Sequence, residues 1–174
     1  FFNRHILTIN GIFKDRIVNE QNNKKMNIAL VAHDNRKQDL SNWVLLNSNE
    51  LADCKIIATK KTGKMVSEHM LNVLTNEEYE KIEFEFLKSG PMGGDQELGA
   101  RITANEIDVL IFLWDPMSMA PHDVDVKALL RLAVLYNVPT ACNRSTADYI
   151  VSSVLFKNKN YKPIQKDYEE YLDN

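Results

Sequence analysis

Blocks of apolar and polar positions alternate along the chain in the way that is typical of strands separated by helices. Short apolar runs of strand length begin near Met26 and recur to about residue 143, and between them apolar residues fall at helical spacing. The predicted strands are residues 27–32, 55–59, a segment containing Ile82, Phe84 and Phe86, residues 108–114 and residues 138–143. The predicted helices are residues 34–47 with Asp34 as N-cap, 62–74, 94–105, 124–136, 145–153 and one in the tail that contains Tyr161, Ile164, Tyr168 and Tyr171.

Strands that alternate with helices predict an α/β domain of three layers, with a mainly parallel five-stranded sheet between two layers of helices. This is a Rossmann-like, doubly wound arrangement. In such sheets ligands bind beyond the carboxyl ends of the strands, near the point where the strand order reverses. The residues that directly follow each strand are therefore the candidates for chemistry.

The composition is that of one folded domain. The 174 residues are 44% hydrophobic and 26% charged, with a formal net charge of −3 and a pI of about 5.8. These values argue against disorder and against broad nucleic-acid binding, which requires a basic surface. No apolar run approaches the roughly 18 residues of a membrane span, so we expect no membrane partner.

Residues 1–25 precede the strand and helix pattern and lack the apolar run of a secretory signal. We therefore expect an N-terminal extension at residues 1–25 and a single folded domain at residues 26–174. Cys54 and Cys142 lie far apart in apolar runs, and neither has a second cysteine at C-x-x-C spacing. That pattern favours two buried, reduced thiols in a cytoplasmic protein over a zinc or redox site.

Polar and reactive side chains gather at the residues that follow the predicted strands. In chain order they are His33, Asp34, Lys37, Thr59, Lys60, Lys61, Thr62, Ser89, Gly90, Asp95, Asp115, His122 and Asp125. Because the carboxyl ends of parallel strands meet at one edge of the sheet, we expect these residues to form one site.

Two of these segments suit a phosphate group. Residues 59–63 cross from a strand into a helix, so their backbone N–H groups are free at the positive end of the helix dipole. Ser89 adds a hydroxyl, and Gly90 adds a backbone that a ligand can approach closely. Neither segment matches the nucleotide P-loop pattern, and ordinary helix capping is the alternative explanation of the threonines.

Asp95 follows two glycines at the start of a predicted helix, where the helix dipole keeps a carboxylate ionised and able to accept a proton. An acid that only stabilises the first helical turn is the alternative. His33 and His122 each follow a strand and lie near carboxylates, although a single histidine is more often structural. A metal site formed by these histidines with Asp34 and Asp125 competes, but the chain lacks the close histidine spacing of metal-binding helices, so we predict no metal.

Four segments, in this order, resemble the methylglyoxal synthase family. They are residues 28–34 (Ile-Ala-Leu-Val-Ala-His-Asp) with Lys37, residues 89–96 (Ser-Gly-Pro-Met-Gly-Gly-Asp-Gln), residues 108–116 and residues 122–131 (His-Asp-Val-Asp-Val-Lys-Ala-Leu-Leu-Arg). The resemblance implies an enzyme, a carbon–oxygen lyase acting on phosphates. Its substrate would be dihydroxyacetone phosphate and its products methylglyoxal and inorganic phosphate, a bypass of glycolysis that uses no cofactor. The resemblance also implies a homohexamer in the cytoplasm.

The resemblance assigns a role to each residue of the expected site. Asp95 matches the catalytic base, and His122 matches the histidine that polarises the substrate oxygens. The positions that match substrate binding are His33, Asp34, Lys37, Thr59, Lys60, Lys61, Thr62, Ser89 and Gly90. Asp34, Asp115 and Asp125 match acidic residues that orient the others.

The chain departs from the family pattern at the expected phosphate loop. Residues 59–63 read Thr-Lys-Lys-Thr-Gly where the family usually has Thr-Gly-Thr-Thr-Gly, so a glycine is lost and two positive charges are gained. Residues 76–80 and 1–25 are additional, and the chain lacks a basic C-terminal end. Three alternatives therefore stay open: an effector-binding domain of the same fold, an inactive phosphate-binding module, and another lyase or isomerase acting on a phosphorylated triose.

Overall fold

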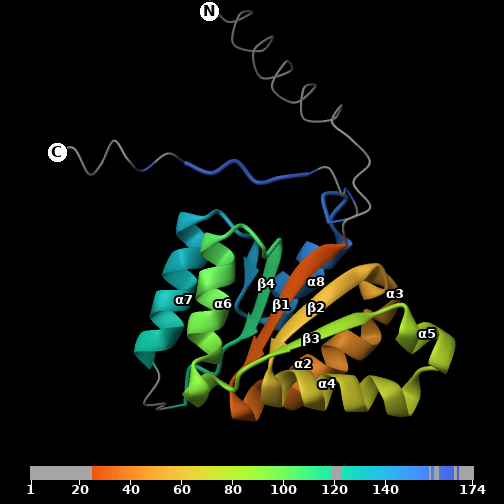
Figure 1. The fold of residues 1–174 in the computed structure, drawn as a ribbon. Helices are drawn as coiled ribbons and strands as arrows, with labels where there is room; N and C mark the ends of the chain where they lie inside the picture. Colours follow the sequence, from red (N-terminus) through yellow and green to blue (C-terminus); the bar gives the residue numbers. More distant parts are fainter. Residues whose placement is uncertain (1–24, 119–122, 157, 159–160, 167, 169–174) are drawn as a thin grey trace, which may run out of the picture.

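Five parallel strands form one twisted sheet in the order β3-β2-β1-β4-β5 (Figure 1). The computed structural model describes residues 25–118, 123–156, 158, 161–166 and 168. The strands are β1 (Met26–Ala32), β2 (Cys54–Thr59), β3 (Glu83–Leu87), β4 (Val109–Leu113) and β5 (Thr140–Ala141). The chain runs outward from β1 to β3 and then continues on the other side of β1 with β4. The strand order therefore reverses between β1 and β4, and the predicted doubly wound fold is confirmed.

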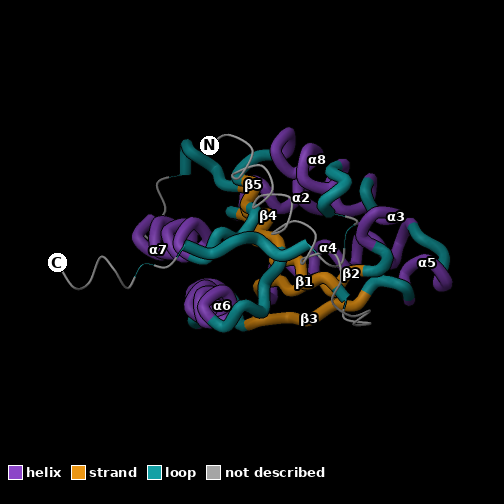
Figure 2. Tube along the Cα trace, turned by 90° about the horizontal axis from the view of Figure 1, so that it is seen from above, coloured by secondary structure: helices purple, strands orange, loops and turns teal. Residues whose placement is uncertain are grey.

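Helices cover both faces of the sheet (Figure 2). One face is covered by α2 (Lys37–Leu46), α4 (Lys60–Val73) and α8 (Arg144–Ser152), and the other by α6 (Gly94–Thr103) and α7 (Asp123–Leu135). The short elements are η1 (Asp34–Arg36), α3 (Ser48–Leu51), α5 (Asn76–Glu80) and η2 (Gly90–Met92). Within the described part of the chain, no helix combines the length and the apolar character needed to cross a membrane.

The alternation of strand side chains produces a separate apolar core on each face of the sheet. Ile28 and Leu30 of β1 pack toward α2, α4 and α8, whereas Ala29 between them packs toward α6 and α7. Trp43 of α2 is fully buried, and its indole N–H donates to a carboxylate oxygen of Asp148 in α8 at 2.8 Å. The two cores fix the helices on both faces, and with them the side chains at the helix starts.

Several predicted boundaries are corrected by the structure. Asp34 is not a helix N-cap, because the chain first makes the 3₁₀ turn η1, for which His33 is the N-cap, and α2 begins only at Lys37. The second helix begins at Lys60 rather than Thr62, so Thr59 is its N-cap.

The ends of the chain differ from the prediction in the described residues. β5 is limited to Thr140–Ala141. The predicted tail helix is wrong for residues 158, 161–166 and 168, which form no helix, and Tyr171 and the extension at residues 1–24 lie outside the described residues.

Both cysteines are free thiols. Cys54 is buried. Cys142 is half-buried, and this partial burial raises the pKa of its thiol.

Charged side chains add to the apolar packing between α6 and the edge strand β3, whose Leu87 lies in the same buried cluster as Leu98 of α6. Glu85 of β3 accepts hydrogen bonds from Arg101 of α6 and is paired with Lys55 of β2 at 2.8 Å. Arg101 first and Lys55 second hold the pKa of Glu85 below its usual range. Glu85 is therefore ionised at neutral pH and fixes the position of α6 over the sheet.

Replacing Glu85 by glutamine is expected to lower the free energy of unfolding by roughly 0.5–1 kcal/mol at pH 7, the range of a surface charge network. A lowered carboxylate pKa stabilises the fold above the ordinary glutamate range near pH 4–5, and that stabilisation is lost as pH falls through the folded-state pKa. Urea unfolding of both proteins at pH 7 and near pH 3 measures the difference.

The matched control is Glu77→Gln, which removes the pair of exposed Glu77 with Lys81 at 3.4 Å. That variant should unfold like the parent at both pH values. A Glu85→Gln difference that persists near pH 3 would contradict the electrostatic explanation.

Candidate active site

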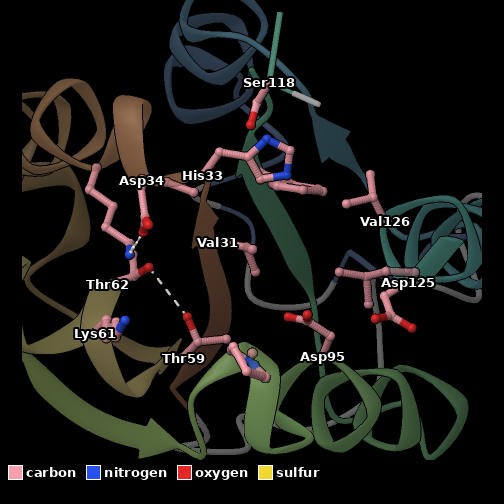
Figure 3. A pocket seen from close by; sticks show the side chains of 16 residues that line it. Val31, His33, Asp34, Thr59, Lys61, Thr62, Asp95, Ser118, Asp125 and Val126 are labelled. Carbon is pink, nitrogen blue, oxygen red and sulfur yellow. Dashed lines mark hydrogen bonds and ion pairs between the residues drawn. The ribbon is translucent and has the colours of Figure 1, made fainter. Parts of the chain in front are cut away.

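A pocket of about 210 Å³ opens at the carboxyl ends of β1, β2 and β4, where the strand order reverses (Figure 3). It is smaller than the roughly 300–1,000 Å³ of pockets for drug-sized ligands and so suits a small metabolite. Its floor is apolar and includes Val31, Phe112, Val126 and Leu129. The polar lining residues that the sequence predicts are His33, Asp34, Lys37, Thr59, Lys61, Thr62, Gly90, Asp95 and Asp125.

One side of the pocket, which we call the cationic wall, consists of Lys37, Thr59, Lys61 and Thr62. Thr59 and Thr62 are buried, and the Thr59 hydroxyl donates to the Thr62 hydroxyl at 3.3 Å. Thr59 is the N-cap of α4 and Thr62 lies in its first turn, at the positive end of the helix dipole. Of the N–H groups in that turn, the one of Lys60 donates to the Lys88 carbonyl at 3.4 Å. Lysines, hydroxyls and a helix N-terminus together provide the donors that a phosphate group accepts.

Lys37 reaches the cationic wall from the start of α2 and is paired with Asp34. The Asp34 side chain is 85% exposed, whereas that of Lys37 is only 14% exposed. The hydrogen bond and charge of Lys37 lower the pKa of Asp34, with smaller contributions from Lys61 and His33. Asp34 therefore remains ionised at neutral pH and holds the Lys37 ammonium at the pocket.

Asp95 lies opposite this wall, in the first turn of α6, with its carboxylate directed into the pocket (Figure 3). Gly93, at φ 93°, adopts the left-handed conformation that lets η2 turn directly into α6. A Cβ atom on Gly90 would lie 3.2 Å from Asp95 Oδ2, so the glycine backbone packs against the carboxylate. Asp95 and Asp125, which accepts from Gln96 Nε2 at 3.2 Å, form the acidic wall.

His33 lies at the C-terminal end of β1 and is held from two sides. Its ring packs edge-on against Phe112, with 5.4 Å between the ring centroids. Its Nδ1 accepts the backbone N–H of Asp115 at 3.2 Å. Because Nδ1 is an acceptor, neutral His33 has its proton on Nε2 and offers a donor to the pocket.

Three of the predicted site residues that the structure describes, Lys60, Ser89 and Asp115, do not line the pocket. Lys60 lines an adjacent hollow with Lys64, Phe86, Leu87, Lys88 and Glu97. Ser89 is the N-cap of η2, and its carbonyl accepts the N–H groups of Met92 and Gly94 at 2.9 and 3.0 Å. Asp115 supports His33 from behind, and His122 lies outside the described residues.

The structure adds residues that the sequence analysis did not assign to the site. Gln96 contacts Asp125, Asn35 contacts Asp115, and Ser118 lines the pocket. Gln96 lies next to Asp95 in a segment of the family resemblance, which was a usable signal. The only signal for Asn35 was its position shortly after the first predicted strand. Among the described residues, no group of three or more histidine, cysteine or acidic side chains is placed to hold a metal ion.

Fold and pocket together define a Rossmann-like α/β protein with a ligand site at the carboxyl edge of its sheet, where a cationic wall faces an acidic one. A family model described as the MGS-like domain matches residues 44–142. The chain belongs to the methylglyoxal synthase family.

Individual relatives agree with this family over most of the chain. Proteins named methylglyoxal synthase from Leptospira interrogans and Maridesulfovibrio salexigens are 52% and 50% identical to it. The alignments cover 81% and 85% of this chain and 88% and 96% of those proteins. The crystal structure of methylglyoxal synthase from Elizabethkingia anophelis superimposes on this structure with a TM-score of 0.72, and the two sequences are 43% identical. The match covers 86% of this chain and 91% of that one.

Proposed function

We propose that the protein is an enzyme, a carbon–oxygen lyase that converts dihydroxyacetone phosphate to methylglyoxal and inorganic phosphate. The observation that supports this most directly is the placement of the Asp95 carboxylate across a small pocket from Lys37, Lys61 and the start of α4. Such a pocket can hold a phosphate at one end and place a carboxylate beside the carbon atoms at the other. The family membership points to the same reaction.

The cationic wall would bind the substrate phosphate. Thr59, Thr62 and the backbone N–H groups of α4 would donate to the phosphate oxygens, and Lys37 and Lys61 would balance their charge. Lys60, just outside the lining, would add a more distant positive charge. Gly90 lines the pocket and would contact the phosphate from the turn that precedes Asp95, and by the family resemblance Ser89, just before it, would do so as well.

Asp95 would remove a proton from the hydroxymethyl carbon beside the carbonyl and leave an enediolate. Negative charge then develops on the former carbonyl oxygen, and donors fixed in advance at that oxygen lower the barrier. His33, with its proton on Nε2, would supply one such donor, and His122 would supply another by the family resemblance. Asp34, Asp115 and Asp125 would orient these groups.

Elimination of phosphate would complete the reaction. The electron pair of the enediolate expels phosphate only when the C–O bond to phosphate stands roughly perpendicular to the enediolate plane. The enol that remains becomes methylglyoxal by taking up a proton at its terminal carbon. These steps are proton transfers and one elimination, so we propose that they require no cofactor and no metal.

The wider setting follows from the family resemblance alone. We propose a cytoplasmic homohexamer that diverts triose phosphate from glycolysis. Sedimentation of the full chain at micromolar concentration would test the assembly independently of the chemistry.

The deciding experiment supplies the full chain with dihydroxyacetone phosphate and measures phosphate and methylglyoxal separately. Equal amounts of both products support the proposal. Formation of glyceraldehyde 3-phosphate instead would identify an isomerase. Tight binding of a phosphate-bearing enediolate analogue, without release of phosphate, would identify an effector- or phosphate-binding domain.

Lys61→Ala is expected to raise KM for dihydroxyacetone phosphate about three- to tenfold and to change kcat little, because it removes charge from the phosphate rather than from the reacting carbons. The increase should shrink as salt rises from 20 to 300 mM, because Lys61 is exposed and its charge is screened. Initial rates at both salt concentrations measure it.

Lys60→Ala is the matched control, since its side chain belongs to the adjacent hollow. Its effect on KM should be smaller than that of Lys61→Ala. Equal effects of the two variants would contradict a specific role of Lys61 in the pocket.

A further inference from the structure

Asn35, in η1, anchors the turn that follows β4. Its side-chain Nδ2 donates to Asp115 Oδ2 at 3.1 Å. The other carboxylate oxygen of Asp115 accepts the backbone N–H of Met117 at 3.0 Å, and the Asp115 carbonyl accepts the N–H of Ser118 at 3.3 Å. An ionised carboxylate only accepts hydrogen bonds, so the Asn35 amide must present its NH₂ group to it. Asn35 thereby fixes this turn against η1.

The same turn holds His33. The backbone N–H that His33 Nδ1 accepts belongs to Asp115, whose side chain Asn35 holds. A displacement of the turn would remove that N–H from Nδ1, and the imidazole proton would then distribute between both ring nitrogens. Asn35 itself is exposed and does not line the pocket, so it influences the site only through Asp115 and His33.

We propose that Asn35 is a positioning residue, which holds Asp115 so that its backbone N–H keeps His33 in the Nε2–H form that donates toward the substrate oxygen. The proposal rests on the proposed function for the role of His33, but the geometry it describes exists without substrate. Its failure can therefore be separated from failure of the proposed function.

The charges around the turn support this arrangement. Hydrogen bonds from the Met117 N–H first and Asn35 second lower the pKa of Asp115, with smaller effects from the charges of His33 and Arg36. Arg36 is also paired with Asp39 of α2 at 2.7 Å, and Asp39 with Arg144 of α8 at 3.4 Å. The other charged groups that line the pocket together with His33 are Asp34, Lys37, Lys61, Asp95 and Asp125.

The first test measures the protonation of the His33 ring directly. In the ¹⁵N spectrum of the full chain without substrate, His33, identified by its loss in His33→Gln, should show protonated Nε2 and unprotonated Nδ1. In Asn35→Ala the Nδ1–H form should become populated. Retention of the parent spectrum in Asn35→Ala would overturn the proposal, whether or not the protein has synthase activity.

The second test compares rates. Asn35→Ala should lower kcat/KM on the order of tenfold, as expected when a group at the reacting atoms loses its orientation.

The Asn35→Asp variant tests the pH dependence, because it keeps the shape of the side chain but places a second carboxylate against Asp115. Its activity relative to the parent should be lowest near pH 8 and should recover toward pH 5, because a shared proton restores one hydrogen bond between the two carboxylates. Dividing by the parent rate at each pH cancels effects of other titrating groups.

Gln38→Ala is the matched control, because it removes an exposed amide donor on the neighbouring helix, where Gln38 Nε2 donates to Asn42 at 3.0 Å. It should retain the parent kcat/KM within about twofold. Asn35→Ala activity within the same range, or an Asn35→Asp activity ratio that does not change with pH, would overturn the proposal. Thermal melts of all variants should coincide with the parent within a few degrees, because Asn35 is exposed.

Discussion

Replacing Asp95 by asparagine is expected to lower kcat by about 10³-fold or more while leaving the fold intact, since general-base catalysis commonly contributes 10²–10⁴-fold. Asparagine has nearly the same volume as aspartate but cannot accept a proton. Release of methylglyoxal and phosphate from dihydroxyacetone phosphate measures the loss.

Binding provides the control for this variant. The cationic wall lies across the pocket from Asp95, so inorganic phosphate should bind to Asp95→Asn at least as tightly as to the parent, because a negative charge has been removed. Activity of Asp95→Asn near that of the parent would contradict the assignment of the base. Loss of both phosphate binding and activity would indicate a structural role instead.

Replacing Gly94 by alanine is expected to produce the second-largest effect, because there is no room for a Cβ atom at the start of α6. That atom would lie 2.1 Å from the backbone oxygen of Lys88 and 3.0 Å from the carbonyl carbon of Ser89. Backbone on one side or the other must move, at a cost of about 1–3 kcal/mol in the free energy of unfolding. Asp95 is the next residue, so kcat should also fall on the order of 100-fold.

Gly99→Ala in the same helix is the control. Its Cβ would lie 3.1 Å from Leu132 Cδ1, the end of a flexible side chain that can move by a few tenths of an ångström. Alanine also favours helix formation by about 1 kcal/mol over glycine, which offsets the crowding. Urea unfolding and initial rates should place Gly99→Ala near the parent. Equal losses in both variants would contradict the special crowding at Gly94.

The strand and helix order could be predicted because β1, β2 and β4 contain apolar runs, β3 alternates charged and apolar residues, and apolar residues recur at helical spacing between the strands. The helix boundaries were less predictable where short polar side chains are compatible with more than one type of turn. After β1 the sequence His33-Asp34-Asn35 suits an N-cap, yet the chain makes a 3₁₀ turn first, since His33 is held to Asp115 and its own N–H donates to Leu113 at 3.4 Å. That choice depends on β4, which is remote in the sequence.

The sequence predicted most of the residues that form the site, but it did not predict the directions in which their side chains point. The parallel topology brings Thr59, Asp95 and His33 to one edge, as the residues after the strands predicted. The direction of the two lysines was not predictable, because Lys60 and Lys61 are consecutive residues in the first turn of α4 and point to different hollows. The hydrogen bond of Asn35 was not predictable because its partner, Asp115, lies 80 residues away in the sequence.

The two walls of the pocket come from separate stretches of chain. The cationic wall is formed within residues 37–62, on the β2 side of β1, and the acidic wall within residues 95–125, after β3. Substitutions can therefore accumulate in one stretch without disturbing the other. In the proposed mechanism, a descendant that lost the Asp95 carboxylate would retain a receptor for anions. One that altered residues 59–62 would retain the proposed base while changing the phosphorylated compounds that it accepts. An enzyme and an anion receptor would then differ by few substitutions.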